Sequence, residues 1–168
     1  MSVDPVTFRS VLSAVPTSVA VVTANTGDGQ CGMTIGSLGS LSLGPPLVLF
    51  CVARQARSHP GLCAARRYCI SVLAEDQASV ARRFVSRDPE RFRDGTFPMD
   101  GLPAVIGATA WLLCSRHDLV AAGDHSIVIA RVEQAERGSA SPLLYLGRTF
   151  RSLTPTDTRH RALAGDHE

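Results

Sequence analysis

Residues 31–46 read CGMTIGSLGSLSLGPP, and they lie between two β-branched segments, SVAVVTA at 18–24 and LVLFCVA at 47–53. Most side chains in this stretch are small or hydroxylated. Small side chains let a ligand approach backbone N–H groups closely, and hydroxyl groups can then hydrogen-bond its polar edge. We therefore interpret residues 31–46 as a strand and loop that bind a ligand.

Short segments rich in apolar and β-branched residues, within this stretch and on both sides of it, predict strands. They lie at residues 18–24, 30–35, 38–43, 47–53, 68–73, 104–114, 117–120, 126–132, 143–145 and 149–153. The polar residues NTGDGQ at 25–30 suit a hairpin turn. Short strands that do not alternate with helices favour a mainly β fold, an antiparallel barrel or sandwich.

A few helices are expected between these strands. Apolar residues at helical spacing predict a short helix over 5–14, and EDQASVARRFV predicts another over 75–85. A helix that begins after Ser58 and runs through 62–67 is also expected, since Pro60 suits a first turn. Residues 86–103 show no periodicity, and two interpretations stay open for them: a lid over a site or a plain connector.

The length of 168 residues fits a single domain, which we place at 1–153, followed by a polar and disordered tail at 154–168. The formal net charge of +2 is too small to suggest nucleic acid as a partner. No segment has the apolar length of a membrane span or the pattern of a signal peptide, so we expect a cytoplasmic protein.

The residue inventory excludes several kinds of chemistry. All 17 basic residues are arginine, which rules out Schiff-base catalysis, lysine-bound pyridoxal phosphate and a Walker A loop. The 5 cysteines include no C-x-x-C pair, so neither a zinc site nor a disulfide framework is indicated. No G-x-S-x-G motif of the serine hydrolases is present.

Gly27-x-Gly29-x-x-Gly32 matches the dinucleotide-binding fingerprint, but its context does not. The residues after Gly32 are too rich in Gly, Ser and Pro for the helix that the fingerprint requires. The acidic residue expected about 20 positions later is also missing, since that position falls in the apolar run 47–53. We interpret these glycines as part of a hairpin.

Two other places could carry chemistry. Arg54 and Arg57 lie just before the helix expected after Ser58, and a helix start flanked by arginines suits a phosphate; the alternative is a capped helix with solvated arginines. The segment 117–125 holds two His/Asp pairs, and His125 begins a strand after a glycine turn. His125 could hydrogen-bond a ligand at a barrel rim, could contribute to a metal site, or could have no role.

Four segments in this order resemble the flavin reductase-like family. They are GMTIGSLGSLSLGPPLVLFCVARQARSHPGL at 32–62, YCISVLAEDQ at 68–77, GDHSIVIARV at 123–132 and PLLYLGRTF at 142–150. The resemblance covers residues 5–153. Members of this family are NAD(P)H:flavin oxidoreductases that supply reduced flavin to two-component monooxygenases.

The resemblance implies an antiparallel split β-barrel of Greek-key type, a homodimer, FMN or FAD as cofactor, and NADH or NADPH as hydride donor. No metal is implied. His125 matches the family histidine beside the nicotinamide, with Arg91 or Phe97 from the long loop as further candidates. The residues expected to contact the flavin are Met33, Thr34, Ser37, Leu38, Ser40, Cys51, Val52 and Ala53, with Arg54, Ser58 and His59 at its phosphate.

One position departs from the family pattern. Where the family commonly reads T-A-N-S, residues 34–37 read T-I-G-S, so Gly36 replaces a polar side chain. Loss of one hydrogen bond costs about 0.5–1.5 kcal/mol, which predicts a loosely held, diffusible flavin. A flavin-binding split barrel without reductase turnover stays open as an alternative.

Overall fold

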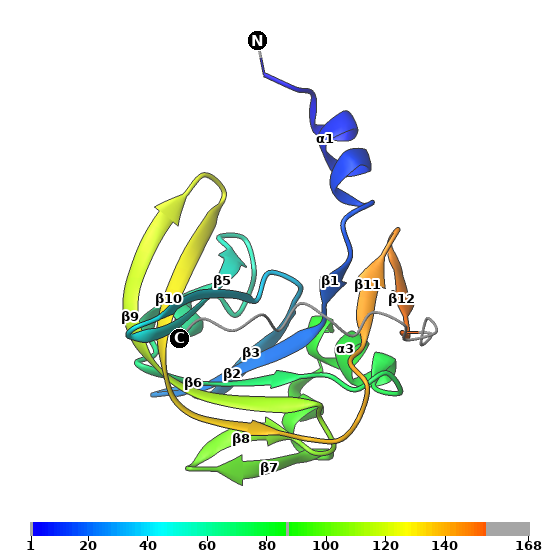
Figure 1. The fold of residues 1–168 in the computed structure, drawn as a ribbon. Helices are drawn as coiled ribbons and strands as arrows, with labels where there is room; N and C mark the ends of the chain where they lie inside the picture. The colour runs from blue at the N-terminus through cyan, green and yellow to red at the C-terminus, as the bar shows by residue number, and fades with distance from the viewer. Residues whose placement is uncertain (1, 87, 154–168) are drawn as a thin grey trace, which may run out of the picture.

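The computed structural model describes residues 2–86 and 88–153, and antiparallel strands dominate it (Figure 1). The helices are α1 (Pro5–Leu12), α2 (His59–Ala64), α3 (Ala78–Val85) and the 3-10 helix η1 (Pro89–Phe92). The strands are β1 (Thr17–Ser18), β2 (Ala20–Thr26), β3 (Gly29–Ile35), β4 (Gly39–Leu43), β5 (Pro46–Ala53), β6 (Arg67–Val72), β7 (Thr96–Met99), β8 (Leu102–Val105), β9 (Ala110–Ala122), β10 (His125–Arg137), β11 (Leu144–Leu146) and β12 (Thr149–Arg151).

Seven of these strands form one sheet in the order β3-β2-β6-β9-β10-β5-β4, in which every neighbouring pair is antiparallel. The sheet curls, and its two edges are joined by the segment between β3 and β4. There the Cys51 amide of β5 donates to the Ser37 hydroxyl at 2.9 Å. The prediction of a mainly β, antiparallel split barrel with a few short helices is confirmed.

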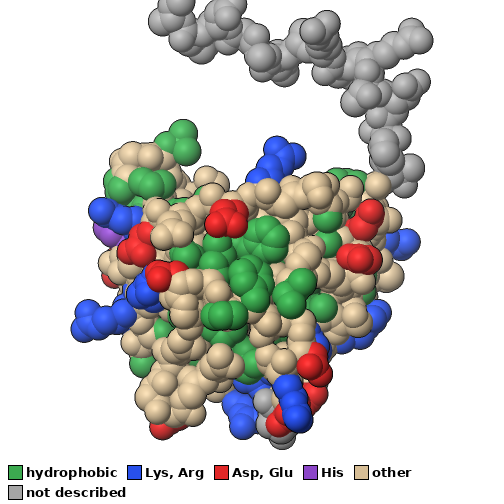
Figure 2. All heavy atoms as spheres, turned by 90° about the horizontal axis from the view of Figure 1, so that it is seen from below, with side chains coloured by type: hydrophobic (Ala, Val, Ile, Leu, Met, Phe, Trp, Pro, Cys, Tyr) green, Lys and Arg blue, Asp and Glu red, His purple; other side chains and the backbone are tan. Residues whose placement is uncertain are grey.

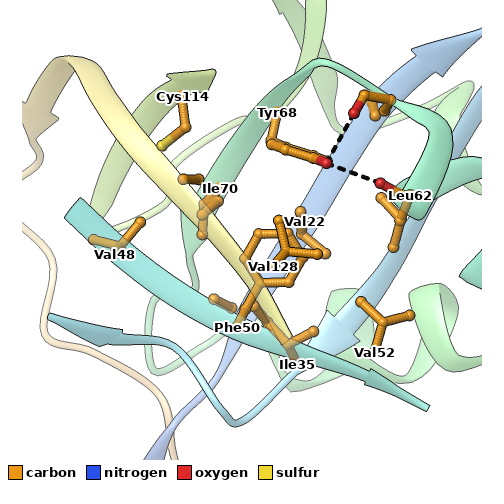
Figure 3. Close-up of a cluster of buried hydrophobic side chains, with 14 residues drawn as sticks. Val22, Ile35, Val48, Phe50, Val52, Leu62, Tyr68, Ile70, Cys114 and Val128 are labelled. Carbon is orange, nitrogen blue, oxygen red and sulfur yellow. Dashed lines mark hydrogen bonds between the residues drawn. The ribbon is translucent and has the colours of Figure 1, made fainter. Parts of the chain in front are cut away.

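β2 contributes to two parts of the core, because other side chains cover both of its faces. Val22 faces the barrel interior with Phe50 and Tyr68, as Figure 3 shows. Val21, the next residue toward the N-terminus, faces a second cluster beneath α3. Since successive strand residues point to opposite faces, the apolar first half of β2, residues 20–22, must be buried on both sides.

α1 has the opposite environment, since it projects away from the sheet and none of its residues is buried (Figure 1). Its start is fixed by Asp4, whose Oδ1 accepts from the amides of Val6 and Thr7 at 3.0 Å. Val6 is 76% exposed. Packing within the described chain therefore does not account for the apolar side of α1.

The last third of the chain corrects several sequence-based boundaries. Residues 86–103, expected to be irregular, contain η1, β7 and the start of β8. The expected strand 104–114 is divided, because 104 and 105 end β8 and β9 begins only at Ala110. β9 then continues through 117–120 to Ala122, paired along its length with β10 across two bulges.

Two helix predictions also need adjustment. α3 begins at Ala78 rather than at 75, because Gln77 Oε1 accepts from the Ala74 amide and holds the preceding residues in a turn. α2 covers only 59–64 of the helix expected to reach residue 67, because Arg67 already begins β6. The tail expected at 154–168 lies outside the described residues, and the domain boundary at 153 stays a prediction.

Figure 2 shows the molecule from below the view of Figure 1. Hydrophobic side chains gather near the middle of this face, and arginines and acidic residues lie around them with both signs interspersed. Exposed apolar surface of this kind is typical of faces that contact other molecules.

Candidate functional site

A cavity of about 620 Å³ lies between β3, the segment that follows β5, and the end of α3. This size falls in the range of small-molecule sites. Its lining residues are Gly32, Met33, Thr34, Gln55, Ala56, Arg57, Ser58, Phe84, Val85, Ser86 and Arg91. Three segments far apart in the sequence therefore build one site.

β3 forms the first wall, and Gly32 in this strand lets neighbouring segments approach closely. A Cβ on Gly32 would lie 2.8 Å from the Val22 carbonyl oxygen and 3.3 Å from the Phe92 ring. Thr34, two residues further along β3, donates its hydroxyl to the Ala81 carbonyl of α3 at 2.7 Å. Small and hydroxylated residues thus let α3 and η1 pack directly on β3.

The segment 55–58 forms the second wall, and its end is held by Ser58. Ser58 precedes α2, but its hydroxyl does not cap that helix as the sequence suggested. It donates to the Gly32 carbonyl at 2.8 Å instead. The helix behind it is fixed from the core, since the Tyr68 hydroxyl donates to the carbonyls of Leu62 and Ala65, both at 2.9 Å.

α3 and η1 form the third wall. Phe84 and Phe92 meet edge to face at a centroid distance of 5.3 Å, which fixes η1 against the end of α3. Arg91 projects from η1 with its guanidinium carbon 5.0 Å from the Phe92 ring centroid. Its Nη1 donates to the Asp88 carbonyl at 3.1 Å. This wall therefore brings a cation to the cavity.

His125 lies beside this cavity without lining it. It begins β10 and pairs with Ala53 at the end of β5, two residues before Gln55 enters the cavity wall. Its Nδ1 lies 2.7 Å from Asp124 Oδ1, and this hydrogen bond holds the pKa of the Asp124 carboxyl below its usual value. When Nδ1 donates to Asp124, Nε2, which has no hydrogen-bond partner within residues 2–86 and 88–153, can meet a ligand.

The other residues predicted to bind a ligand take varied positions. Met33, Thr34 and Ser58 line the cavity, whereas Ser37 and Leu38 lie in the connection to β4 and Ser40 is exposed on β4. On β5, Val52 points into the barrel core, so Cys51 and Ala53 face the other side. Arg54 is exposed and donates its amide to the Asp124 carbonyl at 2.9 Å.

His59 and Phe97 are engaged elsewhere. His59 Nε2 lies 3.0 Å from the Ser126 hydroxyl, which connects α2 to β10 next to His125. Phe97 packs edge to face on Trp111 at 6.2 Å, in the cluster under β7 and β8. Of the two residues suggested from the long loop, only Arg91 reaches the cavity.

The sequence interpretation missed the wall made by α3. The sequence predicted a helix over 75–85, but nothing local indicated that Phe84, Val85 and Ser86 would line a cavity with β3. The available signal was Gly32, because a glycine inside a strand often marks a close approach of another segment.

Two features are absent from the described residues. Across residues 2–86 and 88–153, no three His, Cys, Asp or Glu side chains gather as a metal site would require. Within the same ranges, no helix combines the length and apolar character needed to cross a membrane.

Comparison with known proteins agrees with this geometry. Residues 12–154 match the model of the flavin reductase like domain. A flavin reductase of Pseudomonas putida is 40% identical over 151 residues, which is 87% of this chain and 89% of that protein. HsaB, the reductase subunit of a flavin-dependent monooxygenase in Mycobacterium tuberculosis, is 35% identical over 161 residues, or 93% and 86% of the two chains.

Among solved structures, the NADH:FAD oxidoreductase SgcE6 of Streptomyces globisporus, in complex with NAD and FAD fragments, superposes with a TM-score of 0.86 at 36% identity. The match covers 92% of this chain and 98% of that one. The chain belongs to the flavin reductase-like domain family.

Proposed function

We propose that this protein is an NADH:flavin oxidoreductase that supplies diffusible reduced flavin to a partner flavin-dependent monooxygenase. The observation that carries the proposal is the cavity between β3 and α3, whose wall is small and hydroxylated at Gly32 and Thr34 and cationic at Arg57 and Arg91. Such a wall fits a flat heteroaromatic group with an anionic tail. The family membership and the reductase names of the relatives support the same activity.

The residues present fit a flavin. Met33 and Thr34 on β3, with Ser37, Leu38 and Ser40 beyond them, would hold the ring system, next to Cys51 and Ala53 of β5. Val52 would not contact it, because its side chain is buried in the barrel core. Arg54 and Ser58 would lie at the phosphate end, where Arg57 lines the cavity, whereas the His59 ring is held by Ser126 instead. Bound flavin would supply the chemistry, accepting hydride from the nicotinamide, so the protein needs no nucleophile of its own.

His125 is proposed to position the nicotinamide. Asp124 accepts from Nδ1 and orients the ring, which directs Nε2 away from the carboxylate. The pairing of His125 with Ala53 places it at the strand end from which the cavity wall continues. Holding donor and acceptor in one orientation is the main contribution that a protein makes to such a transfer.

The flavin is proposed to dissociate after turnover. Gly36 offers no side chain toward it, and Ser37 already accepts a hydrogen bond from the Cys51 amide. Loose binding suits a reductase that delivers reduced flavin to a separate oxygenase.

We further propose a cytoplasmic homodimer. All 5 cysteines are free thiols, as expected in a reducing compartment. The exposed apolar residues of α1, among them Val6, Phe8 and Val11, would be covered by a second copy. Light scattering on the purified protein tests the dimer, since a monomeric mass would contradict it.

The activity is tested by following NADH and NADPH oxidation with FMN, FAD or no added flavin. Turnover that depends on added flavin is expected. Flavin binding without oxidation of either nucleotide would replace the reductase with a non-catalytic flavin-binding protein.

The role of His125 is tested with His125→Ala, and His117→Ala on the exposed part of β9 is the matched control. We expect His125→Ala to raise the KM for NADH about 10-fold, the value of one good hydrogen bond, with little change in flavin affinity. His117→Ala should change neither quantity. Equal losses of NADH and flavin affinity in His125→Ala would refute this assignment.

A further inference from the structure

The charges that line the cavity are of one sign. Among residues 2–86 and 88–153, Arg57 and Arg91 are the only ionisable residues that line it, and they come from opposite walls, the 55–58 segment and η1. Uncompensated cations on two sides of a cavity attract an anionic ligand. The neighbours of both arginines lie at Gly32, since Ser58 next to Arg57 bonds the Gly32 carbonyl, and the Phe92 ring next to Arg91 would lie 3.3 Å from a Cβ on Gly32.

Arg91 is held in place without an anionic partner. Its Nε is buried and has no hydrogen-bond partner within residues 2–86 and 88–153. The guanidinium lies over the Phe92 ring, and its one hydrogen bond in the same ranges goes to a backbone carbonyl, that of Asp88. A buried donor without a partner is costly, so the arrangement favours a ligand that satisfies it.

A nearby arginine shows the difference. Arg93, which directly follows η1, forms an exposed ion pair with Glu90 at 2.9 Å and does not line the cavity. Within the described part of the chain Arg91 forms no ion pair with a carboxylate, although acidic residues are close in sequence.

We propose that Arg57 and Arg91 together bind a diphosphate, so that the cavity selects the dinucleotide flavin FAD over FMN. This inference rests on the proposed flavin site. FMN carries one phosphate, which Arg57 can meet from one wall, whereas the neighbouring Ser58 hydroxyl already donates to the Gly32 carbonyl. FAD carries two linked phosphates, and each arginine fork can bind one of them in a bidentate manner.

Equilibrium binding of FAD, FMN, riboflavin and ADP, measured by calorimetry or flavin fluorescence without nicotinamide, tests the proposal. The unchanged protein should bind FAD more tightly than FMN, and ADP should compete with FAD. Arg91→Gln should weaken FAD and ADP about 10- to 100-fold, the value of a charged bidentate contact, and FMN less than about 3-fold. Arg93→Gln should change none of these.

Arg57→Gln, at an exposed position, gives a second test that does not depend on packing in η1. It should weaken FAD more than riboflavin. Equal losses of FMN and FAD in Arg91→Gln would overturn the proposal, and so would unchanged flavin binding with a raised KM for NADH. FAD selectivity that depends on Arg91 but comes without NADH oxidation would support the diphosphate pair while refuting the reductase.

Discussion

Removing one hydroxyl from the core should weaken the support of the cavity wall. Tyr68 is fully buried, and its hydroxyl donates to the carbonyls of Leu62 and Ala65 at the end of α2, the helix that follows Ser58. Tyr68→Phe keeps the ring against Phe50, which it meets edge to face at 5.4 Å. It leaves two carbonyl groups without this donor, so we expect the free energy of unfolding at pH 8 to fall by about 1–3 kcal/mol.

The same substitution has a pH signature with a defined sign. Burial raises the pKa of Tyr68 to about 12, whereas the unfolded chain releases this proton near pH 10. Above pH 10 the unfolded state therefore binds fewer protons than the folded state, and stability falls as pH rises. At pH 11 the titration of Tyr68 should lower the free energy of unfolding of the unchanged protein by about 1.4 kcal/mol. Tyr68→Phe lacks this titrating group and should not show the decrease.

Urea unfolding followed by circular dichroism at pH 8 and pH 11 measures both effects. Burial also raises the pKa of Cys69 to about 11 and that of Cys114 to about 12, but both thiols are present in both proteins and cancel in the difference. Tyr145→Phe, at a partly exposed position, is the control. If the difference in free energy of unfolding between the unchanged protein and Tyr68→Phe is the same at pH 8 and pH 11, the reasoning that burial raises the pKa of Tyr68 is refuted.

Two glycines of the ligand-binding stretch give further predictions. Gly32→Ala should lower the free energy of unfolding by about 1–3 kcal/mol, because its Cβ would press on the Val22 carbonyl at 2.8 Å. In the same urea titration the control Gly27→Ala should be close to neutral, because its Cβ would meet nothing within 4 Å. A Cβ at position 36 would lie 3.1 Å from the Thr17 hydroxyl oxygen, an effect that Gly36→Asn and Gly36→Ala share. Relative to Gly36→Ala, Gly36→Asn should tighten flavin binding about 2- to 10-fold, and calorimetry that finds both variants alike would contradict a missing hydrogen bond.

The strands were predictable where local chemistry decides them. The runs 18–24 and 47–53 are β-branched and apolar, and β2 and β5 lie within two residues of those bounds. The expected hairpin turn is the connection between β2 and β3. Nothing in these segments competes with the extended conformation, so propensity and burial agree.

Residues 86–103 were predicted poorly although one signal was present. Asp100-Gly101 is the dipeptide typical of a tight hairpin, and both residues have positive φ, 47° and 79°. The strands beside it, TFPM and LPAV, each contain a proline, which argues against a strand in the sequence. The prolines are tolerated because β7 and β8 form a separate two-stranded sheet, in which Pro98 pairs only with Pro103.

Only part of the candidate site could be predicted from the sequence, for a related reason. The β3 wall and the 55–58 segment could be recognised from small side chains and nearby arginines, which are local features. The opposing wall depends on α3 and η1 folding back onto β3, a contact between residues about 50 positions apart that no local pattern encodes. Arg91 could be suspected from its charge, but its orphaned Nε is visible only in the folded chain.

The position of β3 in the sheet explains why the same stretch decides the fold and offers a binding surface. β3 pairs with β2 on one side only, so it is an edge strand with backbone groups left free on the other side. One of them, the Gly32 carbonyl, is already used by Ser58 to fix the cavity wall. Large side chains would cover this edge, whereas glycine and threonine leave it open between the two arginines. An unprotected edge invites aggregation, and here α3 and η1 cover it while leaving a cavity. The small residues of 31–46 therefore serve both needs, close packing of a helix on an edge strand and access of a ligand to that edge.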